Sequence, residues 1–230
     1  MLNIEKHKSI FIKILKDIYT DNTLGPLLGF KGGTAALLFY ELNRFSVDLD
    51  FDLLDPEKED YVFERVGKTL SVYGKMKEQT KKRFTLFYEL SYSDGDRNIK
   101  VEISRRNSGS RYEVANYFGI SMKVMAKEDM FANKLAAFYE RVERTNRDIF
   151  DVWFFSQNSW PINKELFEQR TGLTFKESLV KCIEKLEKVA NRSILSGMGE
   201  LLDAKQKIWA KAKLKAETLF FLKLALDNEK

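Results

Sequence analysis

The sequence predicts an α+β fold, in which an N-terminal α/β lobe with a mixed sheet precedes a C-terminal helical bundle. Short apolar runs separated by turn residues are typical of strands, and most of them lie before residue 125. Apolar residues at helical spacing dominate from residue 127 onward. The 230 residues suffice for one large domain or two small ones. We expect lobes at 1–125 and 126–230, with the boundary somewhere between 125 and 160.

The N-terminal elements follow from local patterns. An apolar stripe at helical spacing predicts a helix over 4–19. A short apolar strand over 27–31 ends at Gly32-Gly33, and Thr34 is the expected N-cap of a helix over 35–42. Alternating Asp and apolar residues predict a strand over 47–53. Pro56 begins the next helix, which we expect to stop at Gly74.

The middle of the chain is rich in strand signals, and the remainder is helical. Strands are predicted over 84–92 and 99–104, separated by the turn Ser93-Asp94-Gly95-Asp96, with short strands around 112–114 and 120–124. Helices are predicted over 128–142, 147–156, 164–169, 175–191 and 201–226. Trp160-Pro161 and 197–199 are the expected breaks between helices.

The composition excludes several classes of protein. Hydrophobic residues make up 44% and charged residues 32%, which is typical of a globular domain. No apolar run approaches the roughly 20 residues of a membrane span, and residues 1–8 lack the apolar core of a signal peptide. The single cysteine, Cys182, excludes an internal disulfide framework, so we expect a cytoplasmic protein. The single histidine, His7, argues against histidine-based acid–base or zinc chemistry.

Two features near the N-terminus carry chemistry. The segment Lys31-Gly32-Gly33-Thr34 places a glycine turn before a helix, where backbone N–H groups can hold phosphates. The segment 48–52 reads Asp-Leu-Asp-Phe-Asp, so that Asp48 and Asp50 share one face of a strand. Mg²⁺, or Mn²⁺ in its place, is a cation that such a pair can hold against a triphosphate. Glu102 is a weaker third candidate ligand from a neighbouring strand, and solvated turn aspartates are the alternative interpretation.

These segments together resemble a known family. Residues 31–37 and 44–51 are similar to the AbiEii/AbiGii nucleotidyltransferase toxins of bacterial abortive-infection and toxin–antitoxin systems, within the polymerase-β-type nucleotidyltransferase superfamily. Residues 129–137, Arg141 and the Arg-Asp-x-x-Asp segment 147–151 resemble the remaining motifs. The resemblance covers about residues 28–155 and implies a Mg-dependent transferase that moves a nucleoside monophosphate from an NTP to an acceptor and releases pyrophosphate.

The resemblance also implies roles for individual residues. Asp48 and Asp50 match the metal-binding pair. Lys31, Gly32, Gly33, Thr34 and Ser46 match the segment near the nucleotide phosphates. Lys134 matches the lysine that contacts the triphosphate, and Asp148 matches the acid of the last motif, so both are expected to complete the cleft. Taken from the residues alone, Lys134 reads as a solvent-side lysine and Arg147-Asp148 as a charge pair at a helix start.

The expected partners are an NTP, an RNA acceptor such as tRNA, and a cognate antitoxin. Two basic runs, 75–83 and 205–215, fit RNA, although each alone reads as a solvated face. Two other classes of function remain open. One is a metal-dependent glycosyltransferase that uses Asp-x-Asp with a sugar nucleotide. The other is a non-catalytic RNA- or protein-binding module on the same scaffold.

Overall fold

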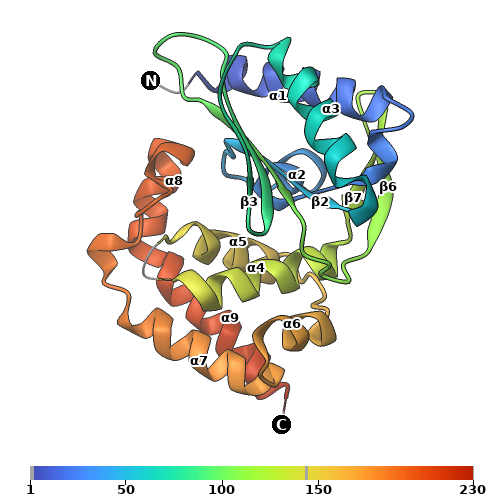
Figure 1. The fold of residues 1–230 in the computed structure, drawn as a ribbon. Helices are drawn as coiled ribbons and strands as arrows, with labels where there is room; N and C mark the ends of the chain where they lie inside the picture. The colour runs from blue at the N-terminus through green and yellow to red at the C-terminus, as the bar shows by residue number, and fades with distance from the viewer. Residues whose placement is uncertain (1–2, 143–144, 230) are drawn as a thin grey trace. The chain divides into compact units, whose positions relative to one another are not determined.

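The computed structural model describes residues 3–142 and 145–229 and confirms the predicted α+β class. The chain divides into two compact units, Met1–Ala126 and Lys127–Lys230 (Figure 1). The first unit holds the sheet together with three α-helices, and in its described residues the second unit is helical.

The first unit is built on a seven-stranded mixed sheet with the order β3-β4-β5-β2-β1-β7-β6. Its strands are β1 (Leu28–Lys31), β2 (Asp48–Leu53), β3 (Lys75–Lys82), β4 (Thr85–Ser91), β5 (Ile99–Ser104), β6 (Tyr112–Tyr117) and β7 (Ile120–Met125). Strand β2 pairs with β1 antiparallel and with β5 parallel, and β1 pairs with β7 parallel. The remaining neighbours are antiparallel. Strands β1 and β2, which carry the glycine turn and the aspartates, therefore lie near the centre of the sheet.

Three α-helices and two 3₁₀ turns complete the first unit. They are α1 (Ile4–Thr20), η1 (Gly25–Leu27), α2 (Gly32–Phe39), η2 (Pro56–Lys58) and α3 (Glu59–Ser71). Figure 1 shows α1 and α3 side by side, and the two helices are in contact. Leu49 and Phe51 of β2 are fully buried, and the ring of Tyr19 on α1 lies 6.4 Å from that of Phe51. The apolar face of β2 thus enters the core, which leaves its aspartates on the opposite face.

The second unit contains α4 (Lys127–Arg141), α5 (Arg147–Gln157), α6 (Lys164–Thr171), α7 (Phe175–Lys188), η3 (Asn191–Ser193), η4 (Gly199–Leu201), α8 (Ala204–Trp209), the π-helical turn η5 (Ala210–Leu214) and α9 (Lys215–Asp227). Helix α7 begins with a capping box, in which Thr174 and Glu177 satisfy each other's backbone N–H groups. Its buried stripe includes Cys182 and Leu186. Cys182 therefore lies in the core of the second unit, and burial raises the pKa of its thiol to about 12.

The structure corrects three details of the sequence interpretation. Helix α2 begins at Gly32, with Lys31 as its N-cap residue, so Thr34 is not the cap. The basic run 75–83 is largely strand β3 at an edge of the sheet. In the second basic run, Lys215 donates to the carbonyls of Glu187 and Val189 at the end of α7, so this lysine has a structural role.

Among residues 3–142 and 145–229, no helix combines the length and the apolar character needed to cross a membrane.

Candidate functional site

The turn between β1 and α2 favours glycine at position 32 and is closely packed at position 33. Gly32 has a φ of +79°, a conformation that favours glycine, and a Cβ built there would lie 2.3 Å from Oδ2 of Asp50. A Cβ on Gly33 would lie 2.9 Å from the Ser46 hydroxyl and 3.0 Å from a terminal nitrogen of Arg44. The first turn of α2 therefore lies directly against the groups that precede and form β2. The first N–H groups of a helix have no partner inside that helix, so this turn is suited to an anion.

Thr34 and Ser46 lie at this turn, and both are buried. The Thr34 hydroxyl donates to the backbone carbonyl of Asp48, so it ties α2 to the start of β2. Ser46 is 7% exposed and Arg44 is 4% exposed. Arg44 also donates to the carbonyl of Phe45 over 2.9 Å. Sequence reasoning assigned no role to Arg44. Its nearness to Gly33 adds a guanidinium, a group that suits a phosphate, to the first turn of α2.

Asp48, Asp50 and Glu102 lie on one face of the sheet. In the parallel pairing of β2 with β5, Asp50 is opposite Glu102 and Asp48 is opposite Lys100. Burial, and then the negative charges of Asp50 and Asp48, raise the pKa of Glu102. The part of this shift that comes from Asp50 and Asp48 reflects the negative charge gathered on this face. A cation would relieve it, and so would a proton on Glu102.

The third aspartate of the strand, Asp52, has a different environment. It is 4% exposed, and Lys31 Nζ lies 2.5 Å from its Oδ1. The Tyr112 hydroxyl from β6 donates to its other oxygen, and the Tyr112 ring covers Gly29, which lies opposite Asp52. The Lys31 ammonium therefore binds a buried carboxylate of its own unit. This pairing competes with the nucleotide contact predicted for Lys31.

The carboxylates on this face are enough for a magnesium ion that is also held by waters and substrate, but not for one held by the protein alone. Within the described ranges 3–142 and 145–229, no three His, Cys, Asp or Glu side chains converge on a common metal position. Mg²⁺ is usually held by one or two carboxylates, with waters and substrate phosphates completing its shell. Asp48 and Asp50, on one face and beside the first turn of α2, supply that number of carboxylates. Glu102 remains the weaker candidate.

His7 contacts the backbone just before β2. It is fully buried on α1, and its Nε2 lies 3.1 Å from the carbonyl oxygen of Val47, the residue before Asp48. A carbonyl only accepts, so Nε2 carries the proton and Nδ1 accepts from the Tyr92 hydroxyl at 2.8 Å. His7 thus holds the backbone that leads into β2. Apart from the presence of a single histidine, no sequence pattern indicates this positioning role.

Lys134 and Asp148 meet within the second unit. Lys134 Nζ lies 2.8 Å from Asp151 Oδ2 and 3.5 Å from Asp148 Oδ1. Arg141 Nε lies 2.7 Å from the other oxygen of Asp148. The Lys134 side chain is 15% exposed, and Asp151 is fully buried. Lys134 is therefore a member of a buried charge network between α4 and α5, and its interpretation as a solvent-side lysine is wrong.

The fold and the β1–α2–β2 arrangement define a class of protein, the nucleotidyltransferase-fold proteins. Two solved structures share the fold. JHP933 from Helicobacter pylori superposes with a TM-score of 0.58 at 20% identity, covering 100% of this chain and 96% of that one. A chain described as a "putative nucleotidyltransferase from H. pylori" also gives 0.58 at 20% identity, covering 99% and 97%. A comparison with curated proteins gave no match.

The family model described as "Nucleotidyl transferase AbiEii toxin, Type IV TA system" matches residues 13–213. This chain therefore belongs to the AbiEii family of nucleotidyltransferase toxins from type IV toxin–antitoxin systems, which confirms the resemblance found in the sequence.

Proposed function

We propose that this protein is a Mg²⁺-dependent toxin that transfers a nucleoside monophosphate from an NTP to an RNA acceptor. One observation carries the proposal. The Asp50 carboxylate lies against the first turn of α2, where even a Cβ on Gly32 would meet it at 2.3 Å. The turn that we propose to bind phosphate and the carboxylate that we propose to bind the metal are therefore adjacent, as a metal-bound triphosphate requires.

In this proposal, different residues of the first unit bind the phosphates and the cation. Backbone N–H groups at Gly33 and Thr34 bind phosphate oxygens, with help from the Ser46 hydroxyl. Asp48 and Asp50 hold the cation. Mg²⁺, when bound, supplies positive charge to the α-phosphate and lowers the pKa of the acceptor hydroxyl.

The proposed reaction is a displacement at the α-phosphorus. The acceptor oxygen loses its proton and bonds to this phosphorus, and the bond between the phosphorus and the α–β bridging oxygen breaks. Pyrophosphate carries that bond's electron pair away. Orientation by the phosphate-binding turn contributes to the rate because the acceptor and the phosphorus must lie in line.

We further propose that Lys134 neutralises the leaving pyrophosphate and that Asp148 orients Lys134. The contacts of Lys134 with Asp148 and Asp151 support an ordered, charged ammonium. The same contacts suit a purely structural role, so a test of Lys134 must separate stability from activity.

Family membership supports the biological setting. A toxin of a type IV system implies a cognate antitoxin, and we propose that such a partner counteracts this chain in the cytoplasm. We propose tRNA as the acceptor, modified at its acceptor end. The net charge of +5 supports a polyanionic acceptor in sign, although it does not identify one.

The direct test offers the purified chain each α-³²P-labelled NTP in turn, with total RNA and either Mg²⁺, Mn²⁺ or EDTA. We expect label in one RNA class with one preferred NTP, and none in EDTA. The variant Asp48→Asn/Asp50→Asn keeps the shape of both side chains and removes their charge, so it is expected to lose labelling by at least a hundredfold.

The exposed Asp94, which lies in a turn of the same unit, provides the control Asp94→Asn, and it should label RNA as the wild type does. Thermal unfolding shows whether each variant is folded. RNA labelling that persists in folded Asp48→Asn/Asp50→Asn would reject the metal-site assignment. Failure of every NTP to label RNA with the folded wild type would point first to a protein or small-molecule acceptor, and then to a non-catalytic binding module.

A further inference from the structure

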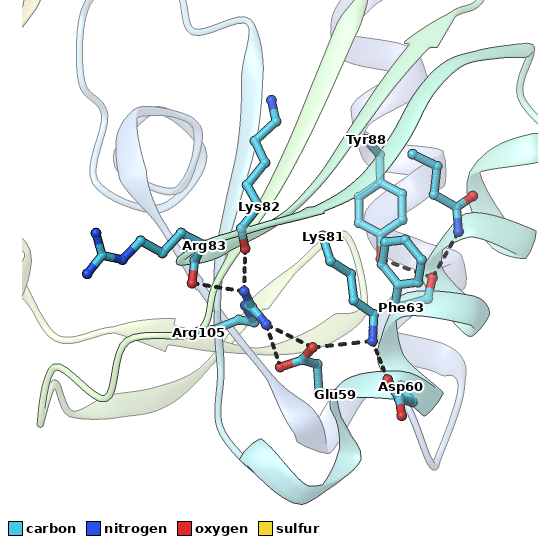
Figure 2. A network of polar contacts seen from close by, with 9 residues as sticks. Glu59, Asp60, Phe63, Lys81, Lys82, Arg83, Tyr88 and Arg105 are labelled. Atoms are coloured by element: carbon cyan, nitrogen blue, oxygen red, sulfur yellow. Dashed lines mark hydrogen bonds and ion pairs between the residues drawn. The ribbon is translucent and has the colours of Figure 1, made fainter.

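The turn between β3 and β4 is held in one conformation by a single arginine. Arg105 follows β5 directly, and its backbone N–H donates to the carbonyl of Phe84 over 2.9 Å. Its guanidinium donates to the carbonyl of Arg83 over 2.9 Å and also to that of Lys82 (Figure 2). Three successive carbonyls of this turn therefore accept hydrogen bonds from one residue, which ties the turn to the end of β5.

The same guanidinium is fixed from its other side by α3. Arg105 Nη1 lies 2.9 and 3.0 Å from the two oxygens of Glu59. Lys81 is also bound there, to Glu59 at 3.3 Å and to Asp60. Lys81 and Arg105 thus have carboxylate partners. In Figure 2 the side chains of Lys82 and Arg83 extend away from this network.

An exposed aromatic ring lies at the tip of the turn, with two guanidinium groups near it. Phe84 is 41% exposed. The Arg83 guanidinium carbon lies 4.8 Å from the centre of its ring, and that of Arg106 lies 4.4 Å away. Both arginines are exposed, and neither makes an ion pair with a carboxylate in the part of the chain that the structure describes. We call Lys82, Arg83, Phe84 and Arg106 the hairpin platform.

The hairpin platform adjoins the sheet face that carries the aspartates. Phe87 is opposite Glu102, and Glu102 is opposite Asp50, so these side chains share one face. Lys82 Nζ lies 3.2 Å from the centre of the Phe87 ring on that face, and its positive charge acts on Glu102. Strands β3 and β2 are three strand spacings apart, about 14 Å.

A hollow of about 200 Å³ also begins at the hairpin platform. The residues that line it include Arg106, Ser108, Ser110, Asp52 and Tyr112. Polar groups thus continue from the hairpin platform toward the strand that holds Asp48 and Asp50.

We propose that the hairpin platform binds an unpaired segment of the acceptor RNA, with Phe84 stacking on a base and Arg83, Arg106 and Lys82 contacting phosphates. This inference rests on the proposed function, because it assigns the acceptor's binding surface. A base in a duplex has no free face to offer, so an exposed ring among cations favours single strands. The Lys82–Glu78 pair at 3.5 Å is exposed on both sides and would compete only weakly with a phosphate.

The exposed ring of Phe84 is the reason for proposing RNA and not an acidic protein segment as the ligand. Carboxylates would pair with Arg83 and Arg106 but gain nothing from a flat aromatic surface, whereas every base has a face to stack. Arg105 acts as a positioning residue in this proposal, since it fixes the turn without offering its guanidinium to the strand. A pre-ordered turn lowers the entropy cost of binding.

The test measures binding without catalysis. Fluorescence anisotropy of a labelled unpaired 12-nucleotide RNA, with EDTA and no NTP, gives a Kd for the full chain, and the same strand in a duplex gives a comparison. We expect Phe84→Leu to weaken single-strand binding roughly 5- to 100-fold. We expect Phe84→Trp to restore it. Arg83→Gln/Arg106→Gln should reduce the slope of log Kd against log salt by about 1.4.

Matched controls come from elsewhere in the chain. Phe118 is 79% exposed in the turn between β6 and β7, so Phe118→Leu removes an equivalent ring from another site. Lys176 and Lys181 are exposed on α7, so Lys176→Gln/Lys181→Gln makes the same change in net charge. We expect both controls to bind RNA within twofold of the wild type.

The outcomes separate this inference from the proposed function. Wild-type binding by a folded Phe84→Leu would overturn the hairpin platform even if the enzyme labels RNA. Equal affinity for the single-stranded RNA and for the duplex would also reject the proposal. So would binding of poly-glutamate as tightly as RNA, if that binding disappears in Arg83→Gln/Arg106→Gln. Binding that depends on Phe84 without any labelling would support the hairpin platform and count against the transferase.

Discussion

The carboxylate of Asp50 occupies the space that a side chain on Gly32 would need. The two residues come from different elements, and the pairing of Lys31 with Asp50 brings them together. Oδ2 of Asp50 would lie 2.3 Å from a Cβ at position 32. Gly32 therefore has two roles. It allows a backbone φ of +79°, and it leaves room for Asp50, a candidate metal ligand.

Gly32→Ala should destabilise the protein by about 1–3 kcal/mol because alanine strains a backbone with positive φ. It should also abolish nucleotidyl transfer by displacing Asp50. Gly95 is the matched control, since it has the same φ of +79° and nothing within 4 Å of its Cβ position. Gly95→Ala should lose similar stability and keep its activity. Equal activities of the two variants, measured by NTP incorporation and urea unfolding, would contradict the role of Gly32.

Glu102→Gln should stabilise the metal-free protein at neutral and higher pH. Burial and the charges of Asp50 and Asp48 raise the pKa of Glu102, so the wild type loses stability as the pH rises from 4.5 through the folded-state pKa. The glutamine variant lacks that loss. We expect a higher Tm than wild type in EDTA at pH 8 and a smaller rise in Tm on adding Mg²⁺. Glu113→Gln, on the exposed part of β6, should change neither.

His7 should make folding sensitive to mild acid. Burial, which is the largest effect, lowers the pKa of His7 from 6.5, and Arg97 acts in the same direction. The hydrogen bond to Val47 and the charges of Asp48 and Asp96 oppose this shift without cancelling it. The unfolded chain therefore binds a proton first as the pH falls. Stability is full above pH 6.5 and declines from there down to the folded-state pKa.

His7→Gln supplies the comparison, because glutamine can still donate to the Val47 carbonyl. His7 is the only histidine, so the variant should show a flatter dependence of unfolding free energy on pH as the pH falls below 6.5. Both proteins should also lose stability at lower pH, where native carboxylates become protonated. Parallel curves across the whole range would show that the buried ring does not titrate as described.

Local patterns were enough to predict most of the fold. The strand over 99–104 was predicted with the bounds that β5 has, because apolar and polar residues alternate there. Strand β3 was missed because its Lys and Glu residues give no apolar alternation. It exists because β4 supplies a pairing partner and because an edge strand has solvent beside it. The start of α2 was placed late because Gly32 reads as a turn residue, although it is the first residue of the helix.

The candidate site was predictable where its chemistry is local in sequence. Asp48 and Asp50 alternate with buried residues, so the period of the strand places them on one face. The contacts of Lys31 with Asp52, of His7 with Val47 and of Arg105 with the β3–β4 turn join residues 21 to 40 positions apart. Such pairs depend on strand order, and no local pattern specifies strand order. Sequence reasoning therefore found the candidate ligands but missed the residues that hold them in place.

Lys134 allows stability and chemistry to be separated. Lys134→Met should destabilise the second unit by about 3 kcal/mol, because Asp151 is fully buried and would lose a charge partner at 2.8 Å. Lys134→Met/Asp151→Asn removes both charges and should recover much of that loss of stability in urea unfolding.

Transfer activity, measured on the same preparations, distinguishes a role of Lys134 at the triphosphate from a purely structural role. If Lys134 neutralises pyrophosphate, the double variant is stable and inactive, because no cation replaces the lysine at the triphosphate. A double variant that regains both stability and transfer would show that Lys134 serves only to pair Asp151, and the nucleotide contact proposed for it would be wrong.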